Sequence, residues 1–439
     1  MKKALLALVF TLLSLNVAKG AETVYINTPQ EFIQFSKSLN PGTHRDATVY
    51  IQNDLDFTGL SGQFEPIGTI YTTAFYGTLD GQGHTISNLA YHNPRYWYAG
   101  LIGISQGATV RNIIMDKTCS ITGISALNTS SHAETMAYGG IVGACQASRR
   151  ECIITNNVFM GKVEFSGITE KNINLHIGGI VGDTGAAGYT VVSNCANYGT
   201  VSFTGKTDLV SMGGVVGTLL LRYYNSYGYS RFYNCINYGF LSFTGTATKM
   251  LKLGGVIGSN EYKDVQIDNM VNFGIIHYTP KAHSTYEKIG AITGMISYIT
   301  AKRLYWVTGS SYDVVGSFND DQGSVVSVSN FTASNLRLEH YVVVSGHAGN
   351  SLIQALNLAA EINVTAKYSH WLHNEKSYAI SFFAGSEVPF FKMSSQLILM
   401  PNLVDGAKNF DGWYTDKACT TKLSSYYVKG DLNLYAKYV

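Results

Sequence analysis

A short glycine motif recurs through the middle of this chain of 439 residues and constrains its fold more than any other feature. The motif has the form Gly-Gly-Ile/Val-Val/Ile-Gly, and successive copies begin 35–41 residues apart. Four full copies occupy residues 139–143, 178–182, 213–217 and 254–258, and weaker copies lie at 100–103 and 290–294. This period predicts a stack of structural repeats in which each repeat packs on its neighbours.

A second motif, Asn-Tyr/Phe-Gly followed by an apolar stretch, keeps the same period and begins at Asn197, Asn237 and Asn272. Each repeat holds about three short apolar stretches bounded by Gly, Asn or Thr, all too short for helices. We therefore expect an all-β fold, a right-handed parallel β-helix with three strands per coil. The three asparagines should stack in one column, and glycines should lie where a Cβ has no room.

The N-terminal part of the mature chain predicts a cap for this solenoid. Thr28 and Glu31 form a capping box around Pro29, which indicates a helix that ends near residues 40–42. A strand is expected at 47–51. Because an open solenoid end exposes an unpaired edge and its core, we assign residues 21–97 to the cap and the first coil.

The first 20 residues have the pattern of a secretory signal peptide, with Lys2 and Lys3 before an apolar stretch at 4–15 and small residues at 18–20. We therefore expect a secreted or cell-surface protein, without membrane insertion because the apolar stretch is too short to span a bilayer.

Loss of the three lysines of the signal peptide changes the formal charge of the chain from +2 to −1, and only 14% of residues are charged. Such a chain has no electrostatic basis for binding nucleic acid.

Beyond the glycine repeats of 98–300 the period is lost. Residues 301–377 predict a connecting region with one helix at 350–361. Residues 378–439 predict a small separate β-domain, since short apolar stretches return there.

The motifs resemble two known families. The pattern Phe-x-Gly-x-Leu-Asp-Gly-x-Gly-His-Thr-Ile at 75–86, with the glycine repeats, resembles the GLUG-type repeats of exported surface proteins. The tail, with Phe-Asp-Gly-Trp-Tyr at 410–414 and Leu-Asn-Leu-Tyr-Ala-Lys at 432–437, resembles the Listeria–Bacteroides repeat, a β-grasp-like module of cell-surface proteins. The resemblance implies surface display or adhesion and supplies no catalytic set. The chain lacks the His-Glu-x-x-His of a related zinc metallopeptidase family.

The expected function is adhesin-like binding of a host or cell-surface protein or glycan, without catalysis, metal or cofactor. One alternative is a carbohydrate-active β-helix enzyme, a polysaccharide lyase or glycosidase, which needs carboxylates that converge in a groove. The acids of the repeats do not recur at matched positions. Asp80 and His84 lie close together, but we expect Asp80 to cap a turn. A structural spacer that displays the C-terminal domain is the other alternative.

Two aromatic clusters are candidate contact sites. The first is an insertion at 221–233, since aromatic rings with Asn, Ser and Arg suit contacts with sugars or proteins. The second lies at 96–98, where we favour packing of the rings on a neighbouring coil; for the insertion both interpretations stay open. The candidate binding residues are Tyr223, Tyr224, Tyr227, Tyr229, Tyr233, Tyr96 and Trp97.

Six cysteines are too few for a disulfide scaffold of this length. Cys145 and Cys152 bracket a short loop and can form a disulfide in an oxidising compartment. Cys195 and Cys235 occupy equivalent places in successive repeats, and a buried stack is favoured over a disulfide there. No spacing of cysteine and histidine predicts a zinc site.

Overall fold

The computed structural model of the chain describes residues 22–439 with interruptions. It does not describe residues 1–21, 40–42, 61, 93–96, 124–134, 147–149, 170–171, 186–188, 220–228, 261–264, 296–298, 309–315, 317–323, 326–327, 333–342, 345–346, 349–355, 358–368, 374–378, 384–390, 394–396, 401–409 and 427. The predicted signal peptide therefore lies outside the described residues.

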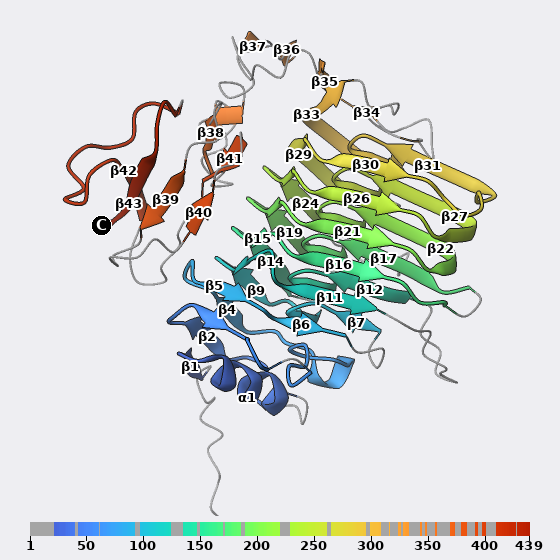
Figure 1. The fold of residues 1–439 in the computed structure, drawn as a ribbon, viewed down its shortest axis with the longest axis horizontal. Coiled ribbons are helices and arrows are strands. Elements are labelled where there is room, and N and C mark those ends of the chain that lie inside the picture. Colours follow the sequence, from blue (N-terminus) through green and yellow to red (C-terminus); the bar gives the residue numbers. More distant parts are fainter. Residues whose placement is uncertain are drawn as a thin grey trace, which may run out of the picture.

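Most strands belong to one rod of stacked coils, in which all paired strands are parallel (Figure 1). Three sheets have six strands each. The β11 sheet contains β6 (Ala90–Tyr91), β11 (Ser120–Gly123), β16 (Lys162–Phe165), β21 (Thr200–Phe203), β26 (Phe240–Phe243) and β30 (Ile275–Tyr278). The β17 sheet contains β7 (Tyr98–Ala99), β12 (Thr135–Gly139), β17 (Asn174–Gly178), β22 (Lys206–Gly213), β27 (Thr246–Gly254) and β31 (Tyr286–Gly290). The β18 sheet contains β8 (Ile102–Ser105), β13 (Val142–Cys145), β18 (Val181–Asp183), β23 (Val216–Leu219), β28 (Ile257–Asn260) and β32 (Thr293–Met295).

The fourth sheet has 17 strands that run as two columns side by side. One column contains β1 (Thr23–Ile26), β2 (Thr48–Ile51), β4 (Thr78–Asp80), β9 (Thr109–Arg111), β14 (Glu151–Thr155), β19 (Tyr189–Ser193) and β24 (Ser230–Tyr233). The other contains β3 (Leu55–Asp56), β5 (Thr85–Ser87), β10 (Ile114–Met115), β15 (Val158–Phe159), β20 (Ala196–Asn197) and β25 (Ile236–Asn237). The columns join in β29 (Val265–Asn272) and β33 (Ile299–Thr308), and β34 (Ser324–Val325) and β35 (Val328–Thr332) follow. The predicted parallel β-solenoid is confirmed.

The expectation of three strands per coil is wrong. The coil that begins with β18 contains five strands, β18 to β22, in four sheets. Two of the corners are too short to interrupt an apolar stretch in the sequence. Only Gly179 and Ile180 lie between the end of β17 at Gly178 and the start of β18 at Val181. The corner between β19 and β20 begins at Asn194, whose backbone is left-handed with φ +52°.

This left-handed corner recurs at an asparagine in five successive coils, and the same conformation continues beyond residue 300. Equivalent corners have φ between +52° and +56° at Asn112, Asn156, Asn194, Asn234 and Asn269. In the next coil Arg303 takes the same conformation, with φ +49°, and its Nε donates to Asp268 Oδ1 at 2.7 Å. Asparagine tolerates this backbone region and arginine rarely adopts it. The recurring asparagine of this corner therefore ends at Asn269, whereas the parallel sheet continues through β33.

The predicted asparagine column is present inside the rod. Asn197 donates through Nδ2 to Asn237 Oδ1 at 2.9 Å, and Asn237 donates to Asn272 Oδ1 at 3.0 Å. In three of the four full glycine motifs the second glycine lies against this column; a Cβ on Gly214, for example, would stand 2.2 Å from Asn237 Cγ. The glycine and asparagine motifs therefore keep the same period because they contact each other.

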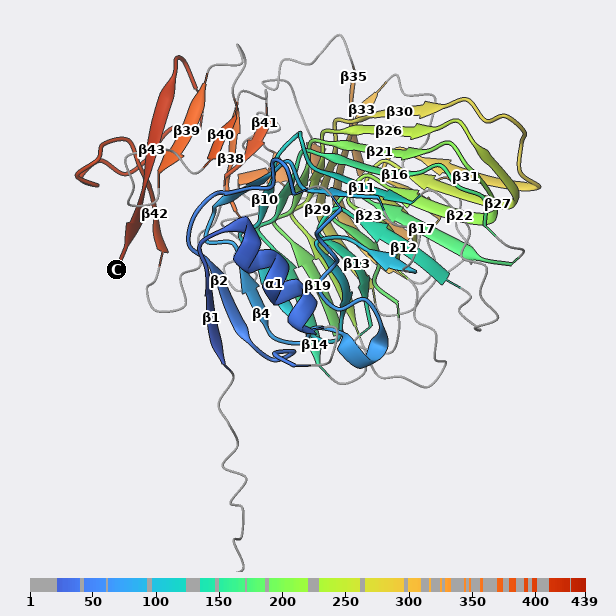
Figure 2. The ribbon, with the colours of Figure 1, turned by 60° about the horizontal axis from the view of Figure 1, so that its bottom comes forward.

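The N-terminal cap is formed as predicted. Helix α1 (Pro29–Leu39) lies across the first coil (Figure 2) and buries Phe32 and Leu39 completely. Thr28 Oγ1 accepts the Glu31 N–H at 3.2 Å, while Glu31 Oε2 accepts the Asn27 N–H at 2.7 Å. A 3₁₀ turn, η1 (Tyr71–Thr73), follows β3. The helix closes the end of the apolar core.

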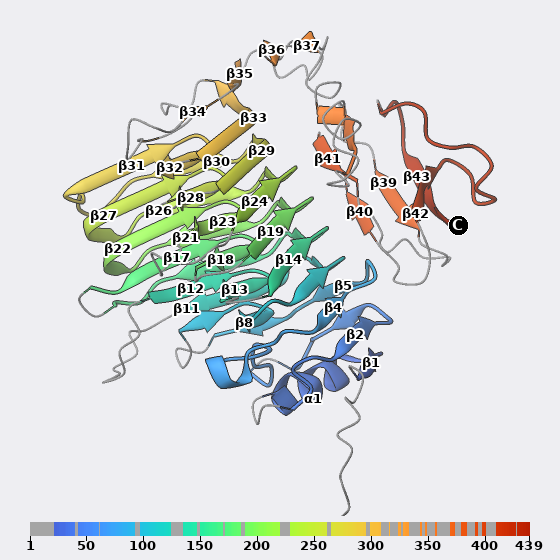
Figure 3. The same ribbon diagram turned by 180° about the vertical axis from the view of Figure 1, so that it is seen from behind.

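The C-terminal region contains a mixed, β-grasp-like sheet beside the rod (Figure 3). Its central strands, the first and last along the chain, are parallel, and its outer strands are antiparallel to them. These strands are β39 (Ile380–Phe383), β40 (Phe391–Met393), β42 (Phe410–Tyr414) and β43 (Leu432–Tyr438). Two smaller pairs are β36 (Val343–Val344) with β37 (His347–Ala348), and β38 (Trp371–His373) with β41 (Leu397–Leu399). Of the helix expected at 350–361, only the helical Leu356 and Asn357 are described.

This region packs on the flank of the rod. Ala196, Ile236 and Val271, stacked in successive coils, share an apolar cluster with buried residues of the C-terminal strands, among them Trp371 and Leu434. The Trp371 indole N–H donates to Asn234 Oδ1 at 2.8 Å. The Ser369 N–H donates to Asn194 Oδ1, also at 2.8 Å. The corner asparagines with positive φ thus form hydrogen bonds that hold the C-terminal region on the rod. That residues 378–439 fold alone stays a prediction.

Candidate functional site

Two facing columns of side chains flank the narrow space between the β17 and β18 sheets. In register along the β17 sheet lie Tyr98, Ala137, His176, Ser211, Lys252 and Lys288, which we call the His176 column. In register along the β18 sheet lie Ile104, Ala144, Asp183, Thr218, Ser259 and Met295, which we call the Asp183 column. The glycine corner places the columns face to face, since His176 precedes it and Asp183 follows it.

The chemistry of this space changes along the rod. In the first two coils it is a small apolar cluster of Ala74, Tyr98, Ile104, Ala137 and Ala144. In the third coil the alanines are replaced by His176 and Asp183, and beyond them come hydroxyl groups and two lysines. The backbone barely differs between coils, so the side chains alone make this segment polar. Such a local departure from the repeat pattern is typical of a functional site.

His176 and Asp183 form the centre of the polar segment. Asp183 is fully buried and His176 is 5% exposed. Asp183 Oδ1 accepts the Gly185 N–H at 2.6 Å, and Oδ2 lies 3.4 Å from His176 Nδ1. Within the described residues, neither Oδ2 nor Nδ1 makes a hydrogen bond. A buried carboxylate needs a compensating charge, and His176 is the group placed to supply it.

A chain of hydroxyl groups continues from this pair. Ser259 Oγ lies 2.8 Å from Thr218 Oγ1 and 2.9 Å from Ser211 Oγ. Ser211 also donates to the carbonyl oxygen of Gly217 at 2.7 Å. Ser211 is buried, and these bonds fix its rotamer. The hydroxyl oxygen is thereby held at a defined place between His176 and Lys252, its neighbours in register.

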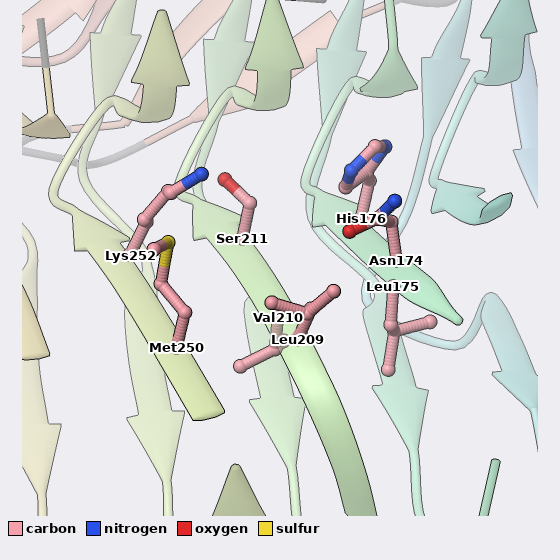
Figure 4. Close-up of a pocket in the computed structure, with 8 residues that line it drawn as sticks. All are labelled: Asn174, Leu175, His176, Leu209, Val210, Ser211, Met250 and Lys252. Carbon is pink, nitrogen blue, oxygen red and sulfur yellow. The ribbon is translucent and has the colours of Figure 1, made fainter. Parts of the chain in front are cut away.

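A pocket of ≈ 80 Å³ opens at this place (Figure 4). The amine of Lys252, the hydroxyl of Ser211 and the imidazole of His176 point to the same side of three adjacent strands. Aliphatic side chains border it, and its lining residues are Asn174, Leu175, His176, Leu209, Val210, Ser211, Met250 and Lys252. The sequence interpretation missed this site. A usable signal was the change from alanine to His and Asp on the two sides of one glycine motif.

The structure describes only part of the predicted aromatic sites. Tyr96, Tyr223, Tyr224 and Tyr227 lie outside the described residues. The insertion also ends earlier than expected, because residues 230–233 form β24 and Phe232 is fully buried. The described members of these clusters, Trp97, Tyr98, Tyr229 and Tyr233, are not among the residues that line the polar pocket described above.

The described aromatic candidates each have packing partners. The Tyr229 hydroxyl donates to Glu151 Oε1 at 2.6 Å, and the Arg231 guanidinium lies 4.0 Å from its ring centre. The Tyr233 hydroxyl donates to Gln266 Oε1 at 2.9 Å. Trp97 is half-buried against the core. The packing interpretation of Trp97 agrees with this position, and ligand binding by Tyr229 and Tyr233 stays a prediction.

Several acidic residues of the described rod form an ion pair with one basic residue, while others, such as Asp116 and Glu151, accept hydrogen bonds from hydroxyl groups. Asp80 accepts the Gln82 N–H at 2.9 Å, as a turn cap should, and Arg111 Nε at 2.8 Å. Further pairs join Asp208 to Lys249, Asp268 to Arg303, Glu164 to Lys162, Glu287 to His283 and Asp54 to His84. No group of three or more His, Cys, Asp or Glu side chains suited to a metal is found among the described residues.

Cys145 and Cys152 are neighbours in the core. Both are buried, and the Cys145 thiol donates a hydrogen bond to the Cys152 sulfur. Burial would raise the pKa of Cys152, but hydrogen bonds from Cys145, the Ser105 hydroxyl and the Gly107 N–H hold it below its ordinary value. Cys195 and Cys235 are also buried and free, in agreement with a stacked pair.

We expect Cys145 and Cys152 to form a disulfide when the chain folds with oxidised glutathione present. The thiolate is the attacking species, and the lowered pKa of Cys152 favours it. Intact mass after alkylation in denaturant should show two cysteines protected, and the variant Cys145→Ala should lose that protection. Alkylation of all six cysteines after oxidative folding would contradict this expectation.

Comparison with known proteins gives limited matches. No protein-family model matches the chain. A segment of 128 residues, 29% of the chain, is 35% identical to halomucin of Haloquadratum walsbyi, of which it covers 1%. A solved structure of a candidate immunoglobulin A1 protease from Bacteroides ovatus is similar with a TM-score of 0.48 and 18% identity, over 72% of this chain and 85% of that one. None of the described helices has the length and hydrophobicity needed to cross a bilayer.

Proposed function

We propose that this chain is an exported surface or secreted protein that binds a cell-surface glycan or protein without catalysis. The observation that carries the proposal is that carboxylates of the described rod, among them Asp80, Glu164, Asp208 and Asp268, are each held in an ion pair with one basic side chain. Glycoside hydrolysis requires two carboxyl groups roughly 5–10 Å apart that act as acid and base or nucleophile. Acids that each have their own basic partner favour a rigid binding scaffold over the enzyme alternative.

Three further features support an exported binding protein. The N-terminal sequence has a signal-peptide pattern, and the motifs resemble GLUG-type and Listeria–Bacteroides repeats of surface proteins. The match to part of halomucin is compatible with a surface protein. The flank packing of the C-terminal region speaks against the spacer alternative, because a spacer would hold its displayed domain at the tip.

The proposal is tested by binding and turnover measured side by side. The full mature chain is applied to arrays of glycans and host-surface proteins, and the same preparation is incubated with polysaccharides in a reducing-sugar assay. We expect saturable binding to at least one array ligand and no release of reducing ends. Release of reducing ends above a heat-denatured control would overturn the proposal in favour of the enzyme alternative.

The predicted contact residues are tested on the same arrays. Replacing Tyr224, Tyr227 and Tyr229 by serine should abolish array binding while leaving the unfolding midpoint nearly unchanged, if the insertion makes the contact. The reason is that aromatic rings supply large contact area at low entropic cost. Unchanged binding together with an unchanged midpoint would place the contact elsewhere on the chain.

A further inference from the structure

We propose that an arginine–tyrosine strip on the outer face of the 17-stranded sheet binds an acidic polysaccharide through its carboxylate or sulfate groups. The inference rests on the proposed binding function and names the ligand class and the surface that takes it. Each arginine of the strip lies over a tyrosine ring, and none forms an ion pair with an acidic residue that the structure describes. The strip consists of Arg45, Tyr76, Arg150, Tyr189, Tyr229 and Arg231.

The parallel sheet brings the tyrosines of the strip into line. Glu151 and Tyr189 are paired in register as the first residues of β14 and β19. Tyr229 directly precedes β24 and continues this column, and Tyr76 begins it two residues before β4. At about 4.8 Å per coil, Tyr76 and Tyr229 are roughly 19 Å apart along the rod. The column faces outward because the alternate residues of these strands, such as Leu79, are buried.

Two arginines share the ring of Tyr76 at the N-terminal part of the strip. The guanidinium carbons of Arg45 and Arg150 lie 5.0 and 4.4 Å from the ring centre. Arg45 is held by two neutral acceptors, a backbone carbonyl and a glutamine side chain, at 2.8 and 3.0 Å. Exposed Arg150 packs so closely on Gly107 that a Cβ on this glycine would stand 2.2 Å from the arginine Cβ. Asp46, which follows Arg45, is exposed and forms no ion pair with a described residue. Two unbalanced positive charges therefore lie within about one Debye length of each other.

The same arrangement recurs further along the rod at Tyr229. The Tyr229 hydroxyl donates to Glu151 Oε1 at 2.6 Å, and its ring meets that of Tyr189 edge to face, with the centres 4.7 Å apart. The guanidinium carbon of Arg231 lies 4.0 Å from the centre of the Tyr229 ring. The Nε of Arg231 is buried and makes no hydrogen bond to a described residue. Stacking on the ring therefore sets the place of this arginine, while its charge stays available to a ligand.

The charge of the strip favours an extended anion. An arginine stacked on a ring can bind a carboxylate or a sulfate through two parallel hydrogen bonds. The mature chain has a formal charge of −1, so its net charge does not attract a polyanion. The arginines supply local positive charge at both ends of the strip. Because these charges are spread along the rod, they fit a linear polymer with repeated anionic groups better than a single small anion.

The surroundings favour a polysaccharide over a peptide. Strands β4, β9, β14, β19 and β24 are each paired on both sides, so they offer no free edge for strand addition. Beside the strip, Thr48, Thr78 and Thr109 stand in register on the same outer face and are half-buried. Their hydroxyl groups both donate and accept hydrogen bonds, as the hydroxyl groups of a sugar require. Aromatic area, hydroxyl groups and fixed guanidinium groups together match an acidic saccharide chain.

The test is calorimetric titration of the full mature chain with polygalacturonate, dextran sulfate, neutral dextran and polyglutamate. We expect the two acidic polysaccharides to bind, with affinity that falls as salt rises. Neutral dextran should not bind, and polyglutamate should bind at least about tenfold more weakly than polygalacturonate. The double variant Arg150→Gln/Arg231→Gln should weaken both acidic polysaccharides about tenfold or more, because it removes two charge-assisted contacts.

The matched control is Lys206→Gln/Lys281→Gln. It removes the same number of positive charges from exposed residues outside the 17-stranded sheet. It should leave the affinities for both acidic polysaccharides unchanged. If the double arginine variant has a lowered unfolding midpoint, Arg150→Gln alone decides, since this side chain is exposed and makes no hydrogen bond to a described residue.

Three outcomes overturn the proposal. The first is equal affinity of the arginine variant and the wild type for the acidic polysaccharides at matched unfolding midpoints. The second is equal binding of neutral dextran. The third is binding of polyglutamate as tight as that of polygalacturonate, which would assign the strip to an acidic protein.

Failure of the broader function is recognised separately. Release of reducing ends from polygalacturonate, with binding that depends on the two arginines, would retain the strip and reject a role without catalysis. Array binding that the arginine variant leaves unchanged, with no binding of polygalacturonate, would reject the strip and retain the surface-binding role.

Discussion

Replacing Gly214 by valine should destabilise the rod by at least about 3 kcal/mol or prevent it from folding. A Cβ at this position would lie 2.2 Å from Asn237 Cγ and 2.3 Å from the carbonyl oxygen of Gly255. Asn237 is hydrogen-bonded to Asn197 and Asn272, so it cannot move without breaking the column. Overpacking alone typically costs about 1–3 kcal/mol, and each lost hydrogen bond adds about 1 kcal/mol.

Urea denaturation measures this effect, with Gly430→Val as the matched control. Gly430 has no atom within 4 Å of where a Cβ would be. The control should therefore keep the free energy of unfolding of the wild type within about 0.5 kcal/mol. Equal loss in the two variants would mean that the glycine repeat does not mark a tight corner.

The solenoid itself was predictable because the glycine motif and the asparagine motif contain the two residues of one recurring contact. Gly214 must be small because Asn237 packs on it, and the pair recurs as Gly179 with Asn197 and Gly255 with Asn272. Side chains that touch across a coil must repeat with the coil, which makes the period visible in a single sequence. The N-terminal helix was predictable for a local reason, the capping box of Thr28 and Glu31.

The number of strands per coil was not predictable from apolar stretches. Corners of only two residues, such as Asn194-Cys195 or Gly179-Ile180, leave the apolar pattern nearly unbroken while the backbone changes direction. The continuation of the sheet through Arg303 was hidden for a related reason, since a neighbouring carboxylate holds an arginine in a conformation usual for asparagine. Tertiary contacts there override local preference.

The candidate site escaped the sequence interpretation because its parts are distant in the chain. Ser211 and Lys252 meet His176 only through register between coils. The high density of aromatic residues favoured the insertion at 221–233 as the site instead. The structure places part of that stretch, including Phe232, in the core. The docking of Trp371 on Asn234 was equally hidden, since it joins residues 137 positions apart. A comparison of equivalent positions in successive coils would have identified His176 and Asp183, where the preceding coil has alanines.

Replacing His176 by alanine should lower the free energy of unfolding by about 3–5 kcal/mol, the usual cost of leaving one partner of a buried ion pair alone. The Asp183 carboxylate is fully buried, and Oδ2 would lose the imidazole of His176, its counter-group among the described residues. Asp183→Ala should cost less at neutral pH. That change removes the buried carboxylate itself, whereas His176→Ala leaves the carboxylate in the core without its neighbour.

The double variant His176→Ala/Asp183→Ala separates charge from packing. It reproduces the coil before it, in which Ala137 and Ala144 occupy the equivalent positions and share an apolar cluster with Tyr98 and Ile104. We therefore expect the double variant to recover most of the stability that His176→Ala loses, in urea denaturation at neutral pH. A double variant as unstable as His176→Ala would trace the loss to a cavity instead. Recovery of stability would show that the polar pair is not needed to build the coil.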